Sequence, residues 1–540
     1  KLRFLMWQQE YLPIADSLAL SALAAAIPIF VLLLLIGVLR KPAWIAALSG
    51  LATAGIIAIG VYDMPAQLAF RSALLGAAFG LLPIGWIVYW AIVLYRLTVE
   101  TGKFEIIKDS IGGLTSDRRL QVLLIAFALG AFIEGAAGFG TPVAVAAAML
   151  TGLGFSPFFA AGICLLANTA PVAFGSIGIP VVTLAATTGL DEQLLSAWVG
   201  RLCAPVSILI PGYLIFVMGG FRALKGVLPA AAVCGIAFAS VQFLMSNFVG
   251  PQLVDIVAAL TAIIALVILF KVWQPEDSFH LEGESHAVLA IRKHGGGETL
   301  LAWSPYLFLV IFVLVWGSPW AAAPLSATTV QIEWPGLHNL VQRMPPVVTS
   351  VAPYTAVYNL SWLSAAGTAC ALATISAALV LRVSPVTYVK LLGSVAKQLF
   401  FSLLTIAAVL ALAFLMNYSG ATVTLGLAFA ATGALFPFFS AILGWLGVFL
   451  TGSDTSANAL FGNLQVVTAN QLGFDPAIMA ASNSAGGVMG KMISLQSLAV
   501  AVAATGMSRS QESQLFRFTF KHSVFLASVL GALAALYAYL

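Results

Sequence analysis

The sequence predicts an all-α protein that crosses a membrane many times, and its composition is the first observation behind this prediction. Of the 540 residues, 61% are apolar and only 8% are charged, whereas about a quarter of the residues in an average soluble domain are charged. A water-soluble core cannot hide this much apolar surface, so the composition excludes a cytosolic enzyme, a secreted binding module and a disordered chain. Segments such as 29–38 are apolar on every face, which disfavours the alternating strands of a membrane β-barrel.

The lengths of the apolar runs are the second observation. A helix needs about 20 residues to cross a bilayer, and the runs 119–155 and 438–470 are too long for one crossing. Small residues interrupt both runs near the middle, at 135–140 and at 452–456. We interpret each run as a re-entrant hairpin, which leaves about twelve transmembrane helices in the other runs. We expect the fairly apolar segment 419–437 to lie as a helix on the surface, and a thirteenth crossing is the alternative. The other runs are 18–39, 43–61, 68–95, 156–187, 193–218, 226–246, 253–270, 300–317, 358–381, 397–418, 473–505 and 519–540.

The few basic residues orient these helices, because Lys and Arg prefer cytoplasmic loops. With the two terminal segments placed outside the cell, most of the 24 Lys and Arg residues fall in cytoplasmic loops. These are Arg40, Lys41, Arg96, Lys103, Lys108, Arg118, Arg119, Arg222, Lys225, Lys271, Arg292, Lys293, Arg382, Lys390, Lys397, Arg509, Arg517 and Lys521. Charges of both signs fill the segment 271–299, which we expect to be a cytoplasmic linker between the halves 1–270 and 300–540.

The two halves share an order of features. Each half contains one hairpin, 119–155 or 438–470, and each hairpin carries one acid at its interruption, Glu134 or Asp454. On the expected topology the first hairpin opens from the cytoplasm and the second from outside. The sequence therefore predicts an inverted-topology repeat, an arrangement that many transporters use.

A long apolar run follows each hairpin, and we expect each to be a broken helix. The run 156–187 contains Asn168-Thr-Ala-Pro, and the run 473–505 contains Asn483-Ser-Ala-Gly-Gly. We place the breaks at these asparagines. Paired broken helices in corresponding positions indicate a binding site near the bilayer midplane. Chance similarity between glycine-rich apolar segments is the alternative.

Four charged residues lie within or next to apolar runs: Glu134, Arg201, Asp454 and Lys491. A charge at membrane depth costs a few kcal/mol, so such residues are usually functional or paired. Glu134 and Asp454 are either satisfied caps at the hairpin interruptions or proton carriers. Lys491 is a suitable partner for either acid or for an anionic substrate. Arg201 is either a structural residue or a member of the same site.

Broken helices also favour anion binding. The N-terminus of a helix that starts at membrane depth exposes unpaired N–H groups, and the helix dipole adds to their attraction for an anion. Nearby amides, hydroxyls and glycines can complete a site for a small carboxylate. The residues that we expect to bind substrate are Gly138, Gly140, Thr141, Asn168, Thr169, Ser453, Thr455, Ser456, Asn483, Ser484 and Lys491.

Other functions have little support in the sequence. The glycines at 295–297 lack the Lys-Ser/Thr ending of a phosphate-binding loop, so any transport should be secondary and independent of ATP. The histidine and cysteine spacings do not match a zinc site, and we expect no metal and no cofactor. Basic residues are few and scattered, which excludes a nucleic-acid partner.

Several long motifs resemble the bacterial L-lactate permease family, which includes glycolate permeases. The motifs are Trp7-Gln-Gln9, Glu134-Gly-Ala-Ala-Gly-Phe-Gly140, Asn168-Thr-Ala-Pro-Val-Ala-Phe-Gly175, Arg343-Met-Pro-Pro-Val347, Asn417-Tyr-Ser-Gly420, Gly444-Trp-Leu-Gly-Val-Phe-Leu-Thr-Gly-Ser-Asp-Thr-Ser456 and Gly490-Lys-Met-Ile-Ser494. The resemblance extends from Trp7 to the C-terminal helix.

This resemblance implies a proton symporter of L-lactate, glycolate and related 2-hydroxymonocarboxylates in the bacterial inner membrane, and not an enzyme. The L-lactate permease family is grouped with the ion-transporter superfamily. This grouping implies an elevator-type transporter architecture, in which one domain moves against a scaffold. Glu134 and Asp454 are then the expected proton-coupling residues. A sodium-coupled carboxylate carrier of the same architecture stays open, since unwound carbonyls near Asn168 and Asn483 can hold Na⁺. The oligomeric state is also open, with a homodimer among the alternatives.

Overall fold

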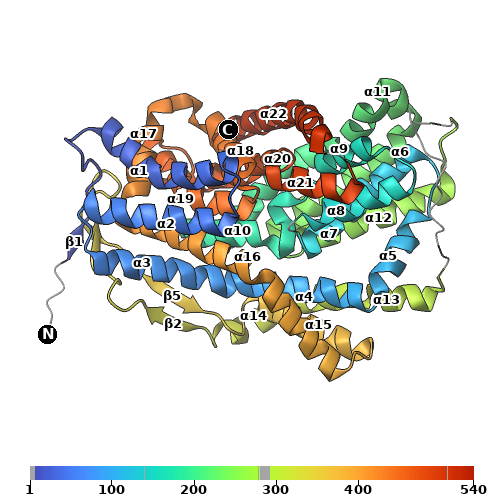
Figure 1. Ribbon diagram of the computed structural model, residues 1–540, viewed down its shortest axis with the longest axis horizontal. Coiled ribbons are helices and arrows are strands. Elements are labelled where there is room, and N and C mark those ends of the chain that lie inside the picture. The colour runs from blue at the N-terminus through green and yellow to red at the C-terminus, as the bar shows by residue number, and fades with distance from the viewer. Residues whose placement is uncertain (1–5, 139, 278, 280–291, 293, 508) are drawn as a thin grey trace.

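The computed structural model describes residues 6–138, 140–277, 279, 292, 294–507 and 509–540, and within them the chain is mostly helical (Figure 1). Eleven helices of this described part are long and apolar enough to cross a membrane, by length and composition. The number is twelve if the bent pair Pro157–Ala167 and Val172–Thr188 is one span. The protein is therefore a multi-pass α-helical membrane protein, as the composition predicts.

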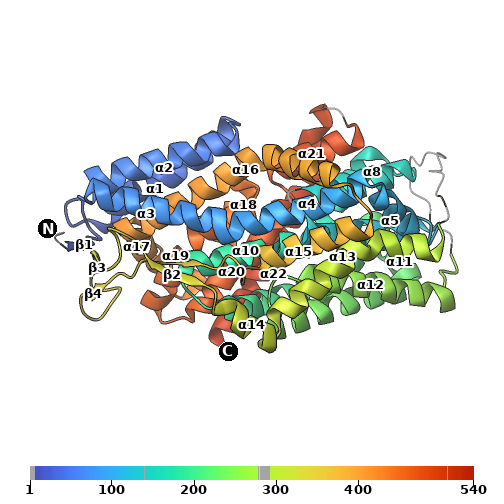
Figure 2. The same cartoon turned by 90° about the horizontal axis from the view of Figure 1, so that it is seen from below.

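One group of helices packs around the long helix α16, which lies against α2 and α3 (Figures 1 and 2). We call this group the α16 bundle. Its members are α1 (Leu18–Leu33), α2 (Ala43–Gly60), α3 (Ala66–Phe79), α4 (Trp86–Glu100), α13 (Gly296–Gly317), α15 (Ala366–Val380) and α16 (Pro385–Ser419). A π-helical segment, Leu34–Val38, extends α1, and another, Gly80–Gly85, joins α3 to α4.

A second group packs around α20, in which every residue from Ala477 to Lys491 is buried. We call it the α20 bundle. Its members are α7 (Gly130–Ala136), α8 (Thr141–Gly152), α9 (Pro157–Ala167), α10 (Gly175–Thr188), α11 (Glu192–Phe248), α12 (Val254–Val272), α18 (Phe436–Thr451), α19 (Asp454–Leu472), α20 (Pro476–Lys491), α21 (Leu495–Thr505) and α22 (Arg509–Tyr539). Within α11 the backbone leaves helical geometry at Gly219, Gly220 and Val227, so this element contains both predicted runs 193–218 and 226–246.

Shorter elements connect the bundles. The short helices are α5 (Lys103–Gly112), α6 (Arg118–Gln121), α14 (Pro319–Ser326) and α17 (Ala421–Phe429), and a π-helical segment, Val122–Leu129, joins α6 to α7. The 3₁₀ turns are Val172–Phe174 and Ala430–Leu435. The middle of the predicted linker 271–299, residues 280–291 above all, lies outside the described residues. Its first part is fixed by Asp277, which forms an ion pair of 2.9 Å with the buried Arg119.

Small strands lie at the end of the molecule that holds the N-terminus (Figure 1). β1 (Trp7–Gln8) pairs in parallel with β3 (Val341–Arg343), and β3 pairs antiparallel with β4 (Ala352–Pro353). A separate antiparallel pair joins β2 (Val330–Glu333) to β5 (Val357–Leu360). After β1, Gln9 Nε2 donates to the carbonyls of Asn417 (2.9 Å) and Tyr418 (2.8 Å) at the end of α16. The N-terminal segment thereby satisfies orphan carbonyls at a helix C-terminus.

Both predicted hairpin interruptions are helix boundaries. The chain turns at 137–140 between α7 and α8, and at 452–453 between α18 and α19, and in each case the two helices pack against each other. Gly452 has a φ of 73°, which glycine adopts easily, and the Ser453 side chain caps α19 by accepting from Ser456 N. Each acid therefore lies at the end of a helix beside a turn.

The expected break at Asn168 is present, since α9 ends at Ala167 and the next helical segment is bent by 64°. The expected break at Asn483 and Ser484 is wrong. Helix α20 continues through both residues and ends at Lys491, and Ser494 caps α21 after a short gap. The glycines that follow Asn483 serve packing: a Cβ on Gly486 would lie 2.6 Å from Ala441 Cα of α18. Small residues allow such close helix contact without breaking a helix.

The prediction for 419–437 is also wrong in part. Helix α17 covers only nine residues and does not lie on the surface, because residues 421–426 are buried between α1 and α19. Tyr62 OH donates to Thr424 Oγ1 at 2.9 Å, and Thr424 Oγ1 donates to Tyr11 O at 2.9 Å. Contacts with distant parts of the chain therefore decide where this segment lies, and its own composition does not show them.

Candidate functional site

A cavity of about 150 Å³ lies where the two helix interruptions meet the α16 bundle. It is small beside the roughly 300–1,000 Å³ of pockets for drug-sized ligands. The first half of the chain contributes Ala43, Glu134, Val172, Gly175, Ser176, Ile179 and Pro180; the second contributes Ser402, Thr405, Ile406, residues 451–456, Lys491 and Gln496. Both bundles therefore line one small cavity that contains two acids and one lysine.

A larger groove of about 930 Å³ lies elsewhere, between α1, α18, α21 and α22. Its lining is almost entirely apolar, with residues such as Phe30, Leu446 and Phe516. The polar exceptions in its lining are Arg40, Glu512 and Ser513, whereas the small cavity combines two acids, a lysine and several hydroxyls.

Asp454 is held firmly by hydrogen bonds. Its Oδ2 accepts from Ser484 Oγ of α20 at 2.6 Å and from Asn458 Nδ2 at 3.5 Å. Asn458 Nδ2 also donates to Ser484 Oγ at 3.1 Å and to Pro180 O of α10 at 3.0 Å. Only Oδ1 is buried without a partner among the described residues. The carboxylate of Asp454 is thus fixed to α20, and its neighbour Asn458 connects it to the first half of the chain.

Asn483 supports this network from behind. Its Nδ2 donates to Asn458 Oδ1 at 2.9 Å, and its Oδ1 accepts from Gln465 Nε2 at 3.1 Å. Both the nitrogen and the oxygen of the Asn483 side-chain amide are therefore hydrogen-bonded. Asn483 does not line the cavity but lies one layer behind the residues that do.

Lys491 is the last residue of α20 and reaches the turn between α18 and α19. Its Nζ donates to Gly452 O at 2.7 Å. An ammonium group has three donors, so two remain for other partners. Both Glu134 and Asp454 lie close enough to interact with Lys491 electrostatically, and the lysine is thus the positive charge between two negative ones.

Glu134 lies near the end of α7, is 4% exposed, and has few partners. Its Oε2 is buried without a hydrogen-bond partner among the described residues. The Asn168 amide approaches the carboxyl group, but neither of its side-chain atoms makes a hydrogen bond of ordinary geometry in that part of the chain. A Cβ on Gly175 would lie 2.6 Å from Glu134 Oε1, so only glycine leaves room for the carboxylate.

The structure divides the residues proposed from the sequence into three groups. Glu134, Ser453, Asp454, Thr455, Ser456 and Lys491 line the cavity. Asn168, Asn483 and Ser484 lie behind the lining and contact the acids or their partners.

The third group does not reach the cavity. Gly140 and Thr141 begin α8, and a Cβ on Gly140 would face Val500 of α21. Thr169, just after α9, donates to Leu166 O near the end of that helix at 2.7 Å. Gly138 lies against Ser176, just outside the lining. Arg201 is structural: its Nε donates to Asn247 Oδ1 at 2.8 Å, and its guanidinium lies over the Trp198 ring at 4.6 Å.

Sequence reasoning missed several polar residues of this region. Ser176, Ser402, Thr405 and Gln496 line the cavity, but serine, threonine and glutamine are too common in apolar runs to stand out. Asp255 is different, because it is the single acid in the run 253–270. It is buried, and the same rule that selected Glu134 could have found it.

The chain was compared with known proteins. A family model described as L-lactate permease matches residues 21–540. The L-lactate permease of Bacillus subtilis (strain 168) is 46% identical over 97% of this chain and 96% of its own length. The glycolate permease GlcA of Escherichia coli (strain K12) is 45% identical over 99% of this chain and 98% of its own length.

Among solved structures, the Alcanivorax borkumensis YdaH transporter matches with a TM-score of 0.45 and 14% identity, over 86% of this chain and 87% of that one. This likeness is too distant to support an argument. The sequence matches, in contrast, extend over nearly the whole chain. The chain belongs to the L-lactate permease family, whose characterised relatives are transporters and not enzymes.

Proposed function

We propose that the protein is a proton symporter that imports L-lactate, glycolate and related 2-hydroxymonocarboxylates across the bacterial inner membrane. The observation that carries this proposal is the cavity of about 150 Å³ in which Glu134, Asp454 and Lys491 converge. Relatives named as lactate and glycolate permeases support the substrate class.

The cavity suits a small anion with a hydroxyl group. Two donors of the Lys491 ammonium are available for a carboxylate, and the N-terminus of α19 adds partial positive charge beside it. The hydroxyls of Thr455 and Ser456 line the same wall, and hydroxyls can both donate to and accept from a 2-hydroxy group. Lactate and glycolate differ by one methyl group, which discriminates by only about 1–3 kcal/mol in a pocket.

The charges of the cavity favour binding a proton together with the substrate. Two carboxylates and one ammonium give a net charge of −1, and a bound monocarboxylate would make it −2. Uncompensated charge at membrane depth is costly, so a proton on Glu134 restores the balance. By thermodynamic linkage, substrate then binds tighter when Glu134 is protonated, and protonation is favoured when substrate is bound.

The architecture supports alternating access by an elevator-type motion. We propose that the halves 1–270 and 300–540 are inverted repeats joined by the linker 271–299, and that the α20 bundle moves against the α16 bundle. The cavity supports this motion because both bundles line it, and a site at such an interface can open first to one side and then to the other.

Purified protein in proteoliposomes tests the proposal. An inward lactate gradient should acidify the lumen, as read by an internal pH dye, and Glu134→Gln should abolish the acidification. Glu333→Gln, which changes an exposed acid on β2, should behave as wild type. Lactate-driven acidification that persists in Glu134→Gln would refute the proton role. Uptake that follows a sodium gradient and ignores a proton gradient would instead indicate a sodium-coupled carrier.

A further inference from the structure

A third buried acid lies beside the cavity and takes no part in the function proposed above. Asp255 occupies the first turn of α12 and is only 1% exposed. Both of its carboxylate oxygens are buried without a hydrogen-bond partner among the described residues. A buried charge with no partner is strongly unfavourable. A carboxyl group at this position is therefore protonated during part of the transport cycle.

Asp255 lies next to the helix end that holds Glu134. A Cβ built on Gly135 would lie 2.7 Å from Asp255 Cβ and 3.0 Å from Ile256 N, so α7 and α12 are in direct contact there. The Glu134 carboxylate is close enough to act on Asp255 electrostatically. The two carboxyl groups are not hydrogen-bonded to each other in this structure, so a proton passes between them when a side-chain rotation or a bridging water brings their oxygens together.

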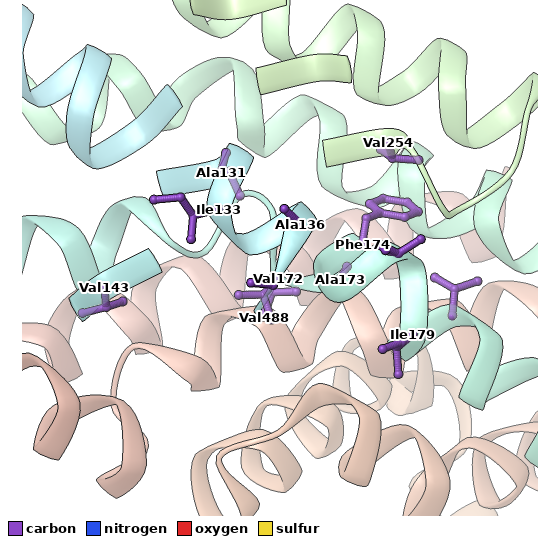
Figure 3. Close-up of a cluster of buried hydrophobic side chains, with 14 of the residues drawn as sticks. Ala131, Ile133, Ala136, Val143, Val172, Ala173, Phe174, Ile179, Val254 and Val488 are labelled. Atoms are coloured by element: carbon purple, nitrogen blue, oxygen red, sulfur yellow. The ribbon is translucent and has the colours of Figure 1, made fainter. Parts of the chain in front are cut away.

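Away from the substrate cavity, the side chains around this pair are mostly apolar. Figure 3 shows a cluster of buried apolar side chains from the end of α7, the turn before α10, the start of α12 and the C-terminal part of α20, among them Ile133, Phe174, Val254 and Val488. Ile133 and Val254 directly precede Glu134 and Asp255 in the chain. Such packing leaves few alternative proton acceptors near Asp255.

Few other titratable groups face Asp255 from the neighbouring elements. On α11 the Cys203 thiol is close enough to interact with Asp255. The segments Val122–Leu129 and Gly175–Thr188, which also contact α12, contain no ionisable side chain. Glu134 is therefore the natural recipient of a proton from Asp255.

A second cavity, of about 280 Å³, lies at the same end of α12. Leu253, two residues before Asp255, lines it together with Glu192 and Gln252, and Gln252 Nε2 donates to Glu192 Oε1 at 2.7 Å. Val182 of α10 lines this cavity, whereas Ile179, one turn earlier, lines the substrate cavity. On the orientation expected from the basic residues, this end of α12 faces outside.

We propose that Asp255 is a second proton carrier, placed in series with Glu134 between the cavity of about 280 Å³ and the substrate cavity. A proton from water in the outer cavity binds the Asp255 carboxylate. When rotation of the side chains or a bridging water joins the two groups, the proton passes from the Asp255 carboxyl oxygen to the Glu134 carboxylate, and Asp255 then regains a proton from outside. The helix dipole at the start of α12 supports the charged form of Asp255 between these steps. This inference rests on the proton symport proposed above.

The test separates proton transfer from substrate binding in proteoliposomes that contain the full chain. Asp255→Asn should keep lactate counterflow, an exchange that needs no net proton transfer, within about twofold of wild type. It should slow uptake driven by an acidic exterior at least tenfold. Glu333→Gln serves as the matched control and should change neither rate.

Different failures have different meanings. If wild-type uptake ignores the proton gradient, the proposed symport is wrong and this inference falls with it. If wild type is coupled but Asp255→Asn keeps full proton-driven uptake, or loses counterflow to the same extent, the role of Asp255 as a carrier is wrong while the symport stands.

A measurement on the wild-type protein covers the case in which Asp255→Asn does not fold. A hydrophobic carbodiimide reacts with protonated carboxyl groups in apolar sites, and peptide mass spectrometry locates the adduct. We expect modification of Asp255 that falls as the external pH rises. Absence of an adduct at every pH, or modification that does not depend on pH, would overturn the proposal.

Discussion

The two acids at the helix interruptions occupy similar places in the chain but very different surroundings. Asp454 accepts hydrogen bonds from Ser484 and Asn458, and a second layer around Asn483 holds those partners in place. Glu134 has an oxygen without any such partner in the described part of the chain, and its neighbours are Gly175 and a third acid, Asp255.

This difference suggests a division of labour. A carboxylate that several donors hold is stabilised in its charged form and in one position. A carboxyl group whose oxygens lack hydrogen-bond partners can gain and lose a proton with little rearrangement of the side chains around it. Of the two proposed proton-coupling residues, Asp454 is therefore better suited to organising the site and Glu134 to carrying the proton. The following predictions test this division.

The largest effect is expected from Lys491→Met. The substitution removes the one cation between the two acids and the hydrogen bond to Gly452 O, which leaves buried like charges without compensation. We expect lactate counterflow to fall at least about a hundredfold, or about 3 kcal/mol. Lys390→Met, at an exposed position on α16, is the control. Counterflow close to wild type in Lys491→Met would show that the lysine does not bind the substrate.

A smaller effect is expected on stability, where substitutions of Asp454 and Glu134 should differ. Asp454→Asn replaces an acceptor by a group with donors, opposite the hydroxyl of Ser484 and the amide of Asn458. We expect it to destabilise the purified protein by about 1–3 kcal/mol. Glu134→Gln removes no strong hydrogen bond and should change the thermal midpoint much less. If thermal unfolding in detergent shows equal losses for the two variants, the contrast between the acids is wrong.

The smallest effect concerns one hydroxyl. Ser484→Ala removes the 2.6 Å hydrogen bond to Asp454 Oδ2 but leaves the Asn458 amide as a donor to the same oxygen, so we expect a loss of only about 0.5–1.5 kcal/mol. Ser482→Ala is the matched control on the same helix, because Ser482 Oγ donates to Ile478 O of α20 itself at 2.8 Å. We expect Ser484→Ala to weaken lactate binding and stability more than Ser482→Ala does. The reverse order would contradict the proposed network.

Much of this fold is predictable from the chain because charge is so scarce in it. The apolar runs and the interruptions beside Glu134 and Asp454 correspond to helices and turns in the structure. The break expected at Asn483 is absent because glycines in apolar sequence have two uses, a break or a close helix contact. Only the position of α18 against Gly486 decides between them.

The candidate site was partly predictable for a similar reason. Residues next to the interruptions, such as Ser453 and Lys491, line the cavity, since a turn at membrane depth places neighbouring side chains together. Thr169 and Gly140 are just as near an interruption in sequence, but they point to other neighbours. Asp255 was overlooked because it lies at the start of an apolar run, where an acid is ordinary in the first turn of a helix. The roles of all these residues stay predictions.

The contact of Gln9 with α16 has a consequence for how the protein is made. Gln9 and the carbonyl of Asn417 that it binds are 408 residues apart in the chain. At a synthesis rate of about 5–20 residues per second, roughly 20–80 s pass between the translation of the two. Strand β3 at Val341–Arg343 is also translated long after β1, so for most of that time neither the strand partner of β1 nor the helix end that Gln9 binds exists. The region in which Gln9 contacts the end of α16 can form only after most of the second half has emerged from the ribosome.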